Sequence, residues 1–147
     1  MGREQEKLPY AQDVEDGPFL EPMRALHQDP GLGLLPRTIP ERGPDPARVY
    51  NTSVLIGRAG ETLGIYRKIH LFDIDIPGQI TFEESAAVAP GTEPVVVDFE
   101  GWKLGLTVCY DLRFPELYRI LVEQGAEILT VPAAFTLQTG KDHWEVL

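Results

Sequence analysis

The fold of this chain is decided by residues 104–116, which read LGLTVCYDLRFPE. In the first five residues apolar side chains alternate with small or polar ones, as in a half-buried strand. Pro115 suits the first turn of a helix, where its missing N–H is not needed. From Pro115 to Gln124 apolar and charged side chains separate onto two helix faces, before a glycine ends the pattern. Because residues 127–131 are a short β-branched run, the segment predicts strand, helix and strand in a parallel crossover.

Cys109, the single cysteine of the chain, lies at the junction between that strand and the helix. The free N–H groups and positive end of a helix favour an anion, so a thiolate nucleophile is stabilised at such a position. The alternative is that a lone cysteine serves as a small buried hydrophobic residue. The nucleophile therefore requires partner residues elsewhere in the sequence.

Three motifs supply such partners. They are residues 66–73 (YRKIHLFD), 82–85 (FEES) and 108–116 (VCYDLRFPE). In order and spacing they resemble the nitrilase superfamily of carbon–nitrogen hydrolases, and within it the Nit branch, which contains ω-amidase and deaminated-glutathione amidase. The resemblance implies the fold and chemistry of that superfamily.

The resemblance covers residues 16–147, which are expected to form a single, partial carbon–nitrogen hydrolase domain, and it is dense after Arg48. Residues 1–15 match nothing and are expected to be irregular. The implied fold class is α/β, as a partial α-β-β-α nitrilase-type sandwich with hairpins and a strand, cysteine turn, helix and strand unit. Residues 143–147 look like the first turn of a further helix, and family members begin earlier and continue further. We therefore expect the chain to be truncated at both ends.

Other elements are predicted from local patterns. They are a helix over residues 19–26, a strand over 31–35 that prolines interrupt, strands over 49–56 and 61–68 joined at 57–60, an ordered loop over 70–84, and a hairpin of 94–98 with 103–108. Eight of the thirteen prolines lie in the first 48 residues, so long elements are not expected there.

Hydrolysis of an unactivated amide by a thiol needs a nucleophile, a carboxylate that moves protons, and a positive group or N–H pair for the oxyanion. In the family resembled, the cysteine attacks the carbonyl, ammonia leaves, and water hydrolyses the thioester. The resemblance assigns the nucleophile to Cys109, the oxyanion-stabilising lysine to Lys68, and a second oxyanion donor to the backbone N–H of Tyr110. Asp111 and Arg113 correspond to residues that brace the turn.

The glutamates are where the sequence departs from the family. Glu84 matches the second active-site glutamate, which positions substrate or relays protons. The alternative is that Glu84 is an exposed loop acid. For Lys68 the corresponding alternative is a solvated lysine at the end of a strand. The family's principal general base lies in a Pro-Glu motif after its first strand, upstream of the segment that residues 16–21 resemble. No such motif precedes residue 16 in this chain. Glu4, Glu6 and Glu15 are candidates by residue type only, and none is assigned.

Composition limits the partners. The formal net charge of −10 argues against a nucleic acid or an anionic membrane, because both require a concentrated basic surface. A single cysteine cannot form an internal disulfide, and no apolar run reaches membrane-spanning length. His70 and Asp73 flank Lys68 but are too few for a metal site. We expect a soluble, cytoplasmic protein with no metal or cofactor, a small-molecule amide substrate and a homo-oligomeric complete form.

The leading hypothesis is an amidohydrolase that cleaves the linear C–N amide bond of a small carboxylate-bearing ω-amide and releases ammonia. One alternative is a catalytically incompetent fragment or pseudoenzyme of the same family that lacks the general-base glutamate. Another is a generic α/β binding module in which Cys109 is only a core residue. This chain alone is expected to be unstable or inactive, because a sheet without its outer strands exposes unpaired backbone groups.

Overall fold

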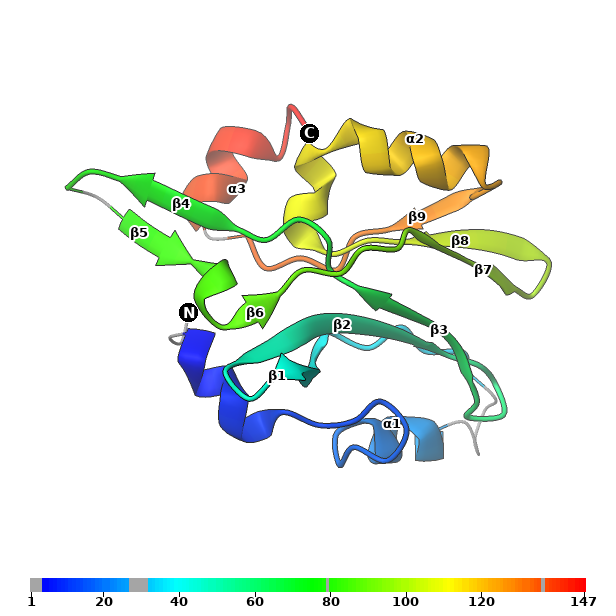
Figure 1. Cartoon of the computed structure of the whole chain (residues 1–147). Helices are drawn as coiled ribbons and strands as arrows, with labels where there is room; N and C mark the ends of the chain where they lie inside the picture. Colours follow the sequence, from blue (N-terminus) through cyan, green and yellow to red (C-terminus); the bar gives the residue numbers. More distant parts are fainter. Residues whose placement is uncertain (1–3, 27–31, 79, 136) are drawn as a thin grey trace.

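The computed structural model describes residues 4–26, 32–78, 80–135 and 137–147 (Figure 1). In chain order, with η for 3-10 helices, the elements are η1 (Glu4–Tyr10), α1 (Leu20–Ala25), β1 (Ile39–Asp45), β2 (Arg48–Ile56), β3 (Thr62–Arg67), β4 (Asp73–Ile76), β5 (Ile80–Glu83), η3 (Glu84–Ala86), β6 (Val88–Ala89), β7 (Val95–Phe99), β8 (Trp102–Leu106), η4 (Cys109–Arg113), α2 (Pro115–Glu123), β9 (Ile128–Thr130) and α3 (Leu137–His143).

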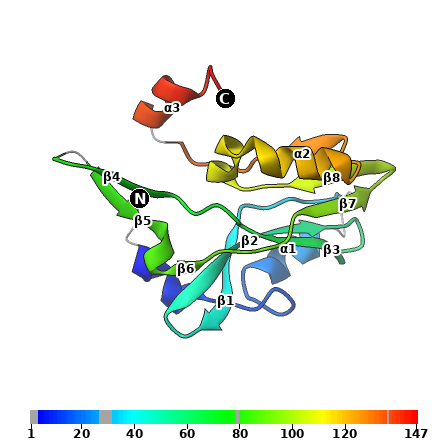
Figure 2. The same ribbon diagram turned by 45° about the horizontal axis from the view of Figure 1, so that its top comes forward.

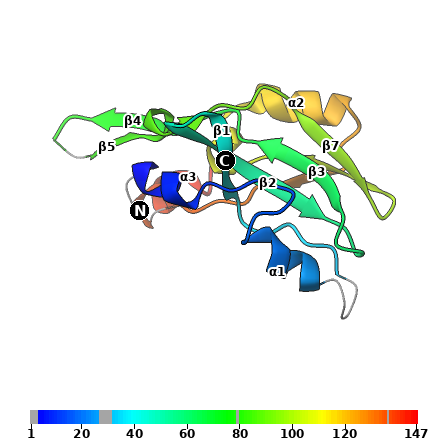
Figure 3. The same ribbon diagram turned by 60° about the horizontal axis from the view of Figure 1, so that its bottom comes forward.

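Two sheets lie face to face, and a helix covers the outer face of each (Figure 1). In the first sheet β2 pairs antiparallel with β1 and β3, and β6 runs parallel to β2. In the second sheet β8 pairs antiparallel with β7 and parallel with β9. Figure 2 shows α2 along the outer face of the second sheet, and Figure 3 shows α1 against the first. The layers therefore follow the order α-β-β-α, which confirms the predicted fold class.

The main core lies between the two sheets. Its buried side chains are Leu55 and Tyr66 from the first sheet, Val97, Leu104 and Leu106 from the second, and Val108 just after β8. Because side chains alternate along a strand, β2 serves two cores: Leu55 faces the second sheet, while Val54 and Ile56 pack with Val14 and Leu20 on the α1 side. The face that carries Leu55 also carries the functional side chains described below.

The strand–helix–strand unit is confirmed. β8 and β9 are parallel neighbours, and α2 connects them with Pro115 at its start. The helix buries Leu117 and Leu121, each of which contributes on the order of 2 kcal/mol when fully removed from water. Gly105 lies under this helix, and a Cβ there would lie 3.2 Å from the Leu121 side chain and 2.9 Å from Leu129. This glycine lets α2 pack closely on the sheet.

Several local predictions are also confirmed. The helix expected over residues 19–26 is α1, the strands over 49–56 and 61–68 are β2 and β3, and the last predicted hairpin is β7 with β8. In the region predicted as a strand over 31–35, residue 31 lies outside the described residues and Leu34 makes an isolated antiparallel bridge to Ile56. Residues 4–10 form η1, and Gln12 pairs with Glu41, while the division of the chain at residue 15 stays a prediction.

Three local predictions are wrong. The loop expected over residues 70–84 contains the β4–β5 hairpin and leads into η3. No strand was predicted over residues 39–45, where the proline content argued against long elements, but β1 is an edge strand in which Pro40 accepts a hydrogen bond from Gln12 on its outer side. The last helix covers Leu137–His143 and ends where residues 143–147 were expected to begin one. Within the described parts of the chain, no helix is long and apolar enough to cross a membrane.

Candidate active site

Cys109 is the first residue of η4, just past the end of β8. Its φ of 50° is positive, which among the described non-glycine residues is shared only with Glu100. Such a conformation is unfavourable by about 1–3 kcal/mol for a residue with a side chain, so the surrounding contacts must hold it. Cys109 was expected at the carboxyl end of a strand, facing a helix N-terminus, and the structure places η4 and Phe114 between it and α2.

Asp111 is the residue that holds this turn. Its carboxylate is fully buried, and Oδ2 accepts hydrogen bonds from the Tyr66 hydroxyl at 2.7 Å and the Val108 N–H at 2.8 Å. Oδ1 accepts from the His70 N–H at 3.0 Å and lies 2.8 Å from His70 Nδ1. Burial and the neighbouring Asp111 charge raise the pKa of Tyr66, so its hydroxyl stays a donor. Asp111 thus ties the residue before Cys109 to Tyr66 on β3 and to His70 in the segment that follows β3.

Arg113 supports the turn by a different contact. Its guanidinium lies 5.5 Å from the centre of the Tyr110 ring, and not on Asp111. The backbone N–H of Tyr110, the expected second oxyanion donor, lies in the first turn of η4, where a helix leaves N–H groups without partners inside the helix. Cys109 donates its own N–H to the Pro132 carbonyl at 3.1 Å.

Lys68 and Glu84 form a buried ion pair. Lys68 Nζ lies 2.6 Å from Glu84 Oε2, and the two side chains are 3% and 5% exposed. Glu84 Oε2 also accepts from the Phe72 N–H at 2.7 Å, and Oε1 accepts from the Asn51 amide at 3.0 Å. The backbone N–H of Lys68 in turn donates to the Asn51 carbonyl, which continues the pairing of β2 with β3. The alternatives of a solvated lysine and an exposed loop acid are therefore wrong.

The environment of Glu84 keeps it ionised. Burial raises the pKa of the Glu84 carboxyl, but the charge and hydrogen bond of Lys68, together with the Phe72 and Asn51 donors, outweigh burial and hold the pKa below its ordinary value. The site therefore contains a fixed carboxylate beside a fixed ammonium group. The carboxylate of such a pair can bind a polar substrate group, and the ammonium group can stabilise a negative charge that develops on the substrate.

This lowered pKa predicts a pH dependence of stability. A carboxyl whose pKa is lower in the folded state stabilises the fold above its unfolded value, near 4.5 here, and loses that contribution as the pH falls through the folded pKa. We expect the free energy of unfolding to fall less between pH 5 and about pH 3 in Glu84→Gln than in the wild type. Urea unfolding at several pH values measures this, and equal slopes for the two proteins would contradict it.

Aromatic contacts connect the ion pair to the Cys109 turn. Phe72, whose N–H binds Glu84, places its ring 5.0 Å from that of Tyr110, the residue after Cys109. Tyr110 contacts Phe114 at 5.5 Å, and Phe114 stacks on His70 at 3.7 Å between ring centres. The structure thus joins Lys68 to Glu84 directly, and it joins both to the cysteine turn through these rings.

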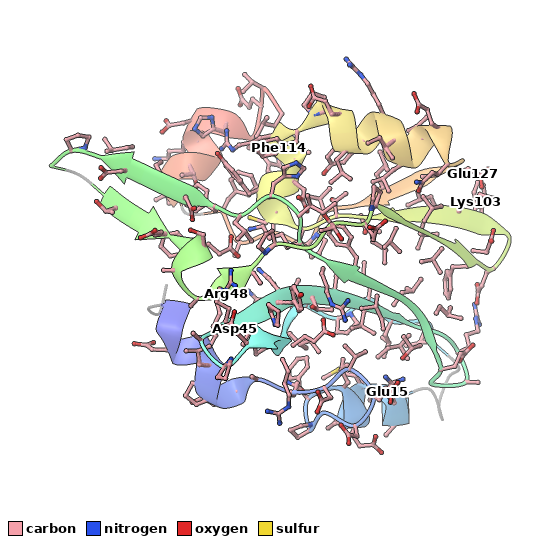
Figure 4. The ribbon with its side chains drawn as sticks, viewed as in Figure 1. Glu15, Asp45, Arg48, Lys103, Phe114 and Glu127 are labelled. Carbon is pink, nitrogen blue, oxygen red and sulfur yellow. The ribbon has the colours of Figure 1, made fainter. Side chains whose placement is uncertain are left out.

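The amino-terminal glutamates do not join this group. Glu6 and Glu15 are exposed, and the side chain of Glu4 lies outside the described residues. Figure 4 shows Glu15 beside α1, on the opposite side of the first sheet from Phe114. The described part of the chain therefore links Lys68 and Glu84 to the Cys109 turn without Glu6 or Glu15.

Sequence reasoning missed Asn51 and Tyr66 and considered His70 only as a metal ligand. A signal for the first two was present in the strand pattern. Asn51 shares with Leu55 the face of β2 that looks toward the second sheet, and Tyr66 precedes Lys68 by two residues on the paired strand. The role of His70 depends on Asp111, which is 41 residues away, so local spacing does not indicate it.

Comparison with known proteins identifies the class. The sequence model of the carbon–nitrogen hydrolase family matches residues 1–147. The chain is 45% identical over 152 residues to deaminated glutathione amidase of Synechocystis sp., covering 100% of this chain and 55% of that protein. It is 41% identical over 138 residues to the omega-amidase NIT2 of Homo sapiens, covering 94% and 49%. The chain belongs to the carbon–nitrogen hydrolase family.

A solved structure gives the same result for the fold. The NitFhit protein of C. elegans superposes with a TM-score of 0.79 at 40% identity, over 87% of this chain and 32% of that chain. The chain spans about half the length of the two curated relatives described above. The relatives thus support the Nit branch of the superfamily.

Proposed function

We propose that the protein is an amidase that hydrolyses the terminal amide of a small carboxylate-bearing ω-amide by way of a Cys109 thioester. The observation that carries this proposal is the strained φ of Cys109 at the end of β8, in a turn that a buried carboxylate holds. Strain of this kind is retained mainly at functional sites. The names of the relatives, an omega-amidase and a deaminated glutathione amidase, support the choice of bond and of substrate class.

In the first half-reaction the Cys109 sulfur attacks the amide carbonyl carbon, a C–S bond forms, and the carbonyl oxygen takes the electron pair. We assign the stabilisation of this oxyanion to Lys68 Nζ and the backbone N–H of Tyr110. Collapse of the intermediate breaks the C–N bond, and the nitrogen leaves as ammonia after it receives the thiol's proton. A carboxylate must carry that proton, and Glu84 is the buried acid beside Lys68.

In the second half-reaction water attacks the thioester carbon, and the C–S bond breaks. One water proton returns to the sulfur, and the product is the free carboxylic acid. The sum is amide plus water giving acid plus ammonia, with the enzyme unchanged. Because the substrate's own carboxylate would be an unpaired anion if buried, it requires a cationic or N–H-rich subsite.

A second candidate function is a catalytically incompetent member of the same family. The observation that favours it is the exposure of Glu6 and Glu15, which leaves no amino-terminal glutamate with a described side chain near the cysteine turn. Such a protein would retain the fold and bind a small amide without turnover. Turnover separates the two candidates.

The test compares three substrates: α-ketoglutaramate, deaminated glutathione and a simple aliphatic nitrile. We expect ammonia release from at least one of the two amides to exceed release from the nitrile by about 100-fold, because a matched carboxylate pairing contributes about 1.5–3 kcal/mol and the nitrile lacks it. The assay uses both this chain and a chimera in which it replaces the matched region of the Synechocystis relative. A preference for the nitrile would exclude the ω-amide assignment. Absence of turnover in both proteins would favour the incompetent alternative.

A further inference from the structure

His70 contacts the Cys109 turn at two points. Its ring Nδ1 and its backbone N–H both lie within hydrogen-bond distance of the same Asp111 oxygen, at 2.8 and 3.0 Å. One face of the ring stacks on Phe114 with centres 3.7 Å apart and planes 8° apart. Asp111 lies within η4 and Phe114 directly follows it, so His70 contacts both the middle and the end of the turn that Cys109 begins.

These contacts lead to the nucleophile through one carboxylate. A carboxylate only accepts hydrogen bonds, so His70 Nδ1 carries the hydrogen that points to Asp111. The other oxygen of Asp111 accepts the N–H of Val108, the residue before Cys109. A change in the position of Asp111 therefore moves the backbone that sets the positive φ of Cys109. Tyr66 also binds this carboxylate. Its hydroxyl donates to Oδ2, the oxygen that accepts the N–H of Val108.

We propose that His70 is a positioning residue that fixes the orientation of Cys109 by holding Asp111 through its Nδ1–H, while its ring packs on Phe114. The proposal rests on the proposed function in so far as Cys109 is the nucleophile. The ring itself is not assigned a contact with substrate or a proton-transfer step. Loss of the His70 contacts should therefore lower the rate of the chemical step, since a displaced nucleophile lowers reactivity more than substrate affinity.

Three substitutions of His70 separate the hydrogen bond from the ring. His70→Phe keeps an aromatic ring for Phe114 and removes the Nδ1 donor. His70→Gln removes the ring and places its amide donor near the position of Nε2, away from Asp111. His70→Asn places an amide N–H near the position of Nδ1 and so restores the donor without the ring. His143→Phe is the matched control, because this histidine lies at the end of α3, where its carbonyl accepts hydrogen bonds from the N–H groups of Val146 and Leu147.

In the chimera with the Synechocystis relative we expect kcat for amide hydrolysis to fall about tenfold or more in His70→Phe and His70→Gln, as for the loss of a hydrogen bond to a charged group. KM should change less than about threefold, and His70→Asn should regain most of kcat, because the chemical step depends on placement of the nucleophile. His143→Phe should behave as the unsubstituted protein. Full kcat in His70→Phe and His70→Gln, or no recovery in His70→Asn, would overturn the proposal.

A second measurement does not depend on catalysis. Amide hydrogen exchange of Val108, followed by NMR in this chain, should be about tenfold faster in His70→Phe and His70→Gln than in the wild type and in His70→Asn, since Asp111 is then held less firmly. If no variant changes the exchange of Val108, the proposal is wrong even when the amidase assay succeeds. If the chain has no amidase activity, the proposed function fails and the exchange data still decide the role of His70.

Discussion

Replacement of Cys109 by alanine is expected to lower ammonia release by at least about 1,000-fold, because removal of a catalytic nucleophile leaves only the binding and oxyanion contributions. Cys109→Ser should be nearly as inactive, since a hydroxyl is a poor nucleophile unless a base activates it. Steady-state assays on the most reactive amide measure both. Retention of more than a few per cent of the activity in Cys109→Ala would show that another group attacks the amide.

The same position allows a test of strain. Alanine keeps the unfavourable positive φ at residue 109, whereas glycine adopts it without a Cβ clash. We expect Cys109→Gly to be more stable than Cys109→Ala by about 1 kcal/mol, the reverse of the usual order. Chemical denaturation of the two inactive variants measures this difference. An alanine variant more stable than the glycine variant would mean that the turn relaxes when the thiol is removed.

The second large effect is expected on stability, from the Lys68–Glu84 pair. Lys68→Met and Glu84→Gln should each lower the free energy of unfolding by about 3 kcal/mol, because each leaves a buried group of opposite charge without its partner. The double variant should lose about as much as one single variant, which gives a coupling energy of about 3 kcal/mol. Urea titrations of the four proteins complete the cycle. Additive losses would show that the two charges do not stabilise each other.

The exposed pair Arg48–Asp45 provides the control. Its atoms are as close, at 2.7 Å, but the side chains are 43% and 37% exposed, and Figure 4 shows both residues beside β1. We expect Arg48→Met to change the free energy of unfolding by less than about 1 kcal/mol, because water screens and solvates exposed charges. A loss as large as that of Lys68→Met would mean that burial is not what makes the Lys68–Glu84 pair matter.

The fold was predictable where one local pattern determines an element. Alternation before Cys109, Pro115 at a helix start and the β-branched run after Gly125 each act over a few residues, and they predicted β8, α2 and β9. β1 failed because its prolines are tolerated only at a sheet edge, and edge position is a property of the whole sheet. Short strands such as β4 and β5 carry too few residues to show a period.

The site was predictable only in its residue types. Cys109, Lys68 and Glu84 came from the resemblance, but their grouping depends on the β4–β5 hairpin, which brings Glu84 back to the N–H of Phe72. The bonds of Asp111 to Tyr66 and His70 cross more than 40 residues of sequence, at separations of 45 and 41. No local rule gives such contacts, because they follow from how the two sheets stack.

The pairing of β2 with β3 restricts where the length of this chain can change. Its register shifts between Leu55 and Ile56, so Thr52 through Leu55 are matched one-to-one with β3 on the site side of the shift. On β3, Arg67 binds Glu41 on the outer face, and the next residue, Lys68, points into the site. A single deletion between the shift and Lys68 would exchange these two cations between the faces. An extra residue in the 57–60 loop leaves both in place, so insertions and tags are compatible with the site at that loop and not within the strand.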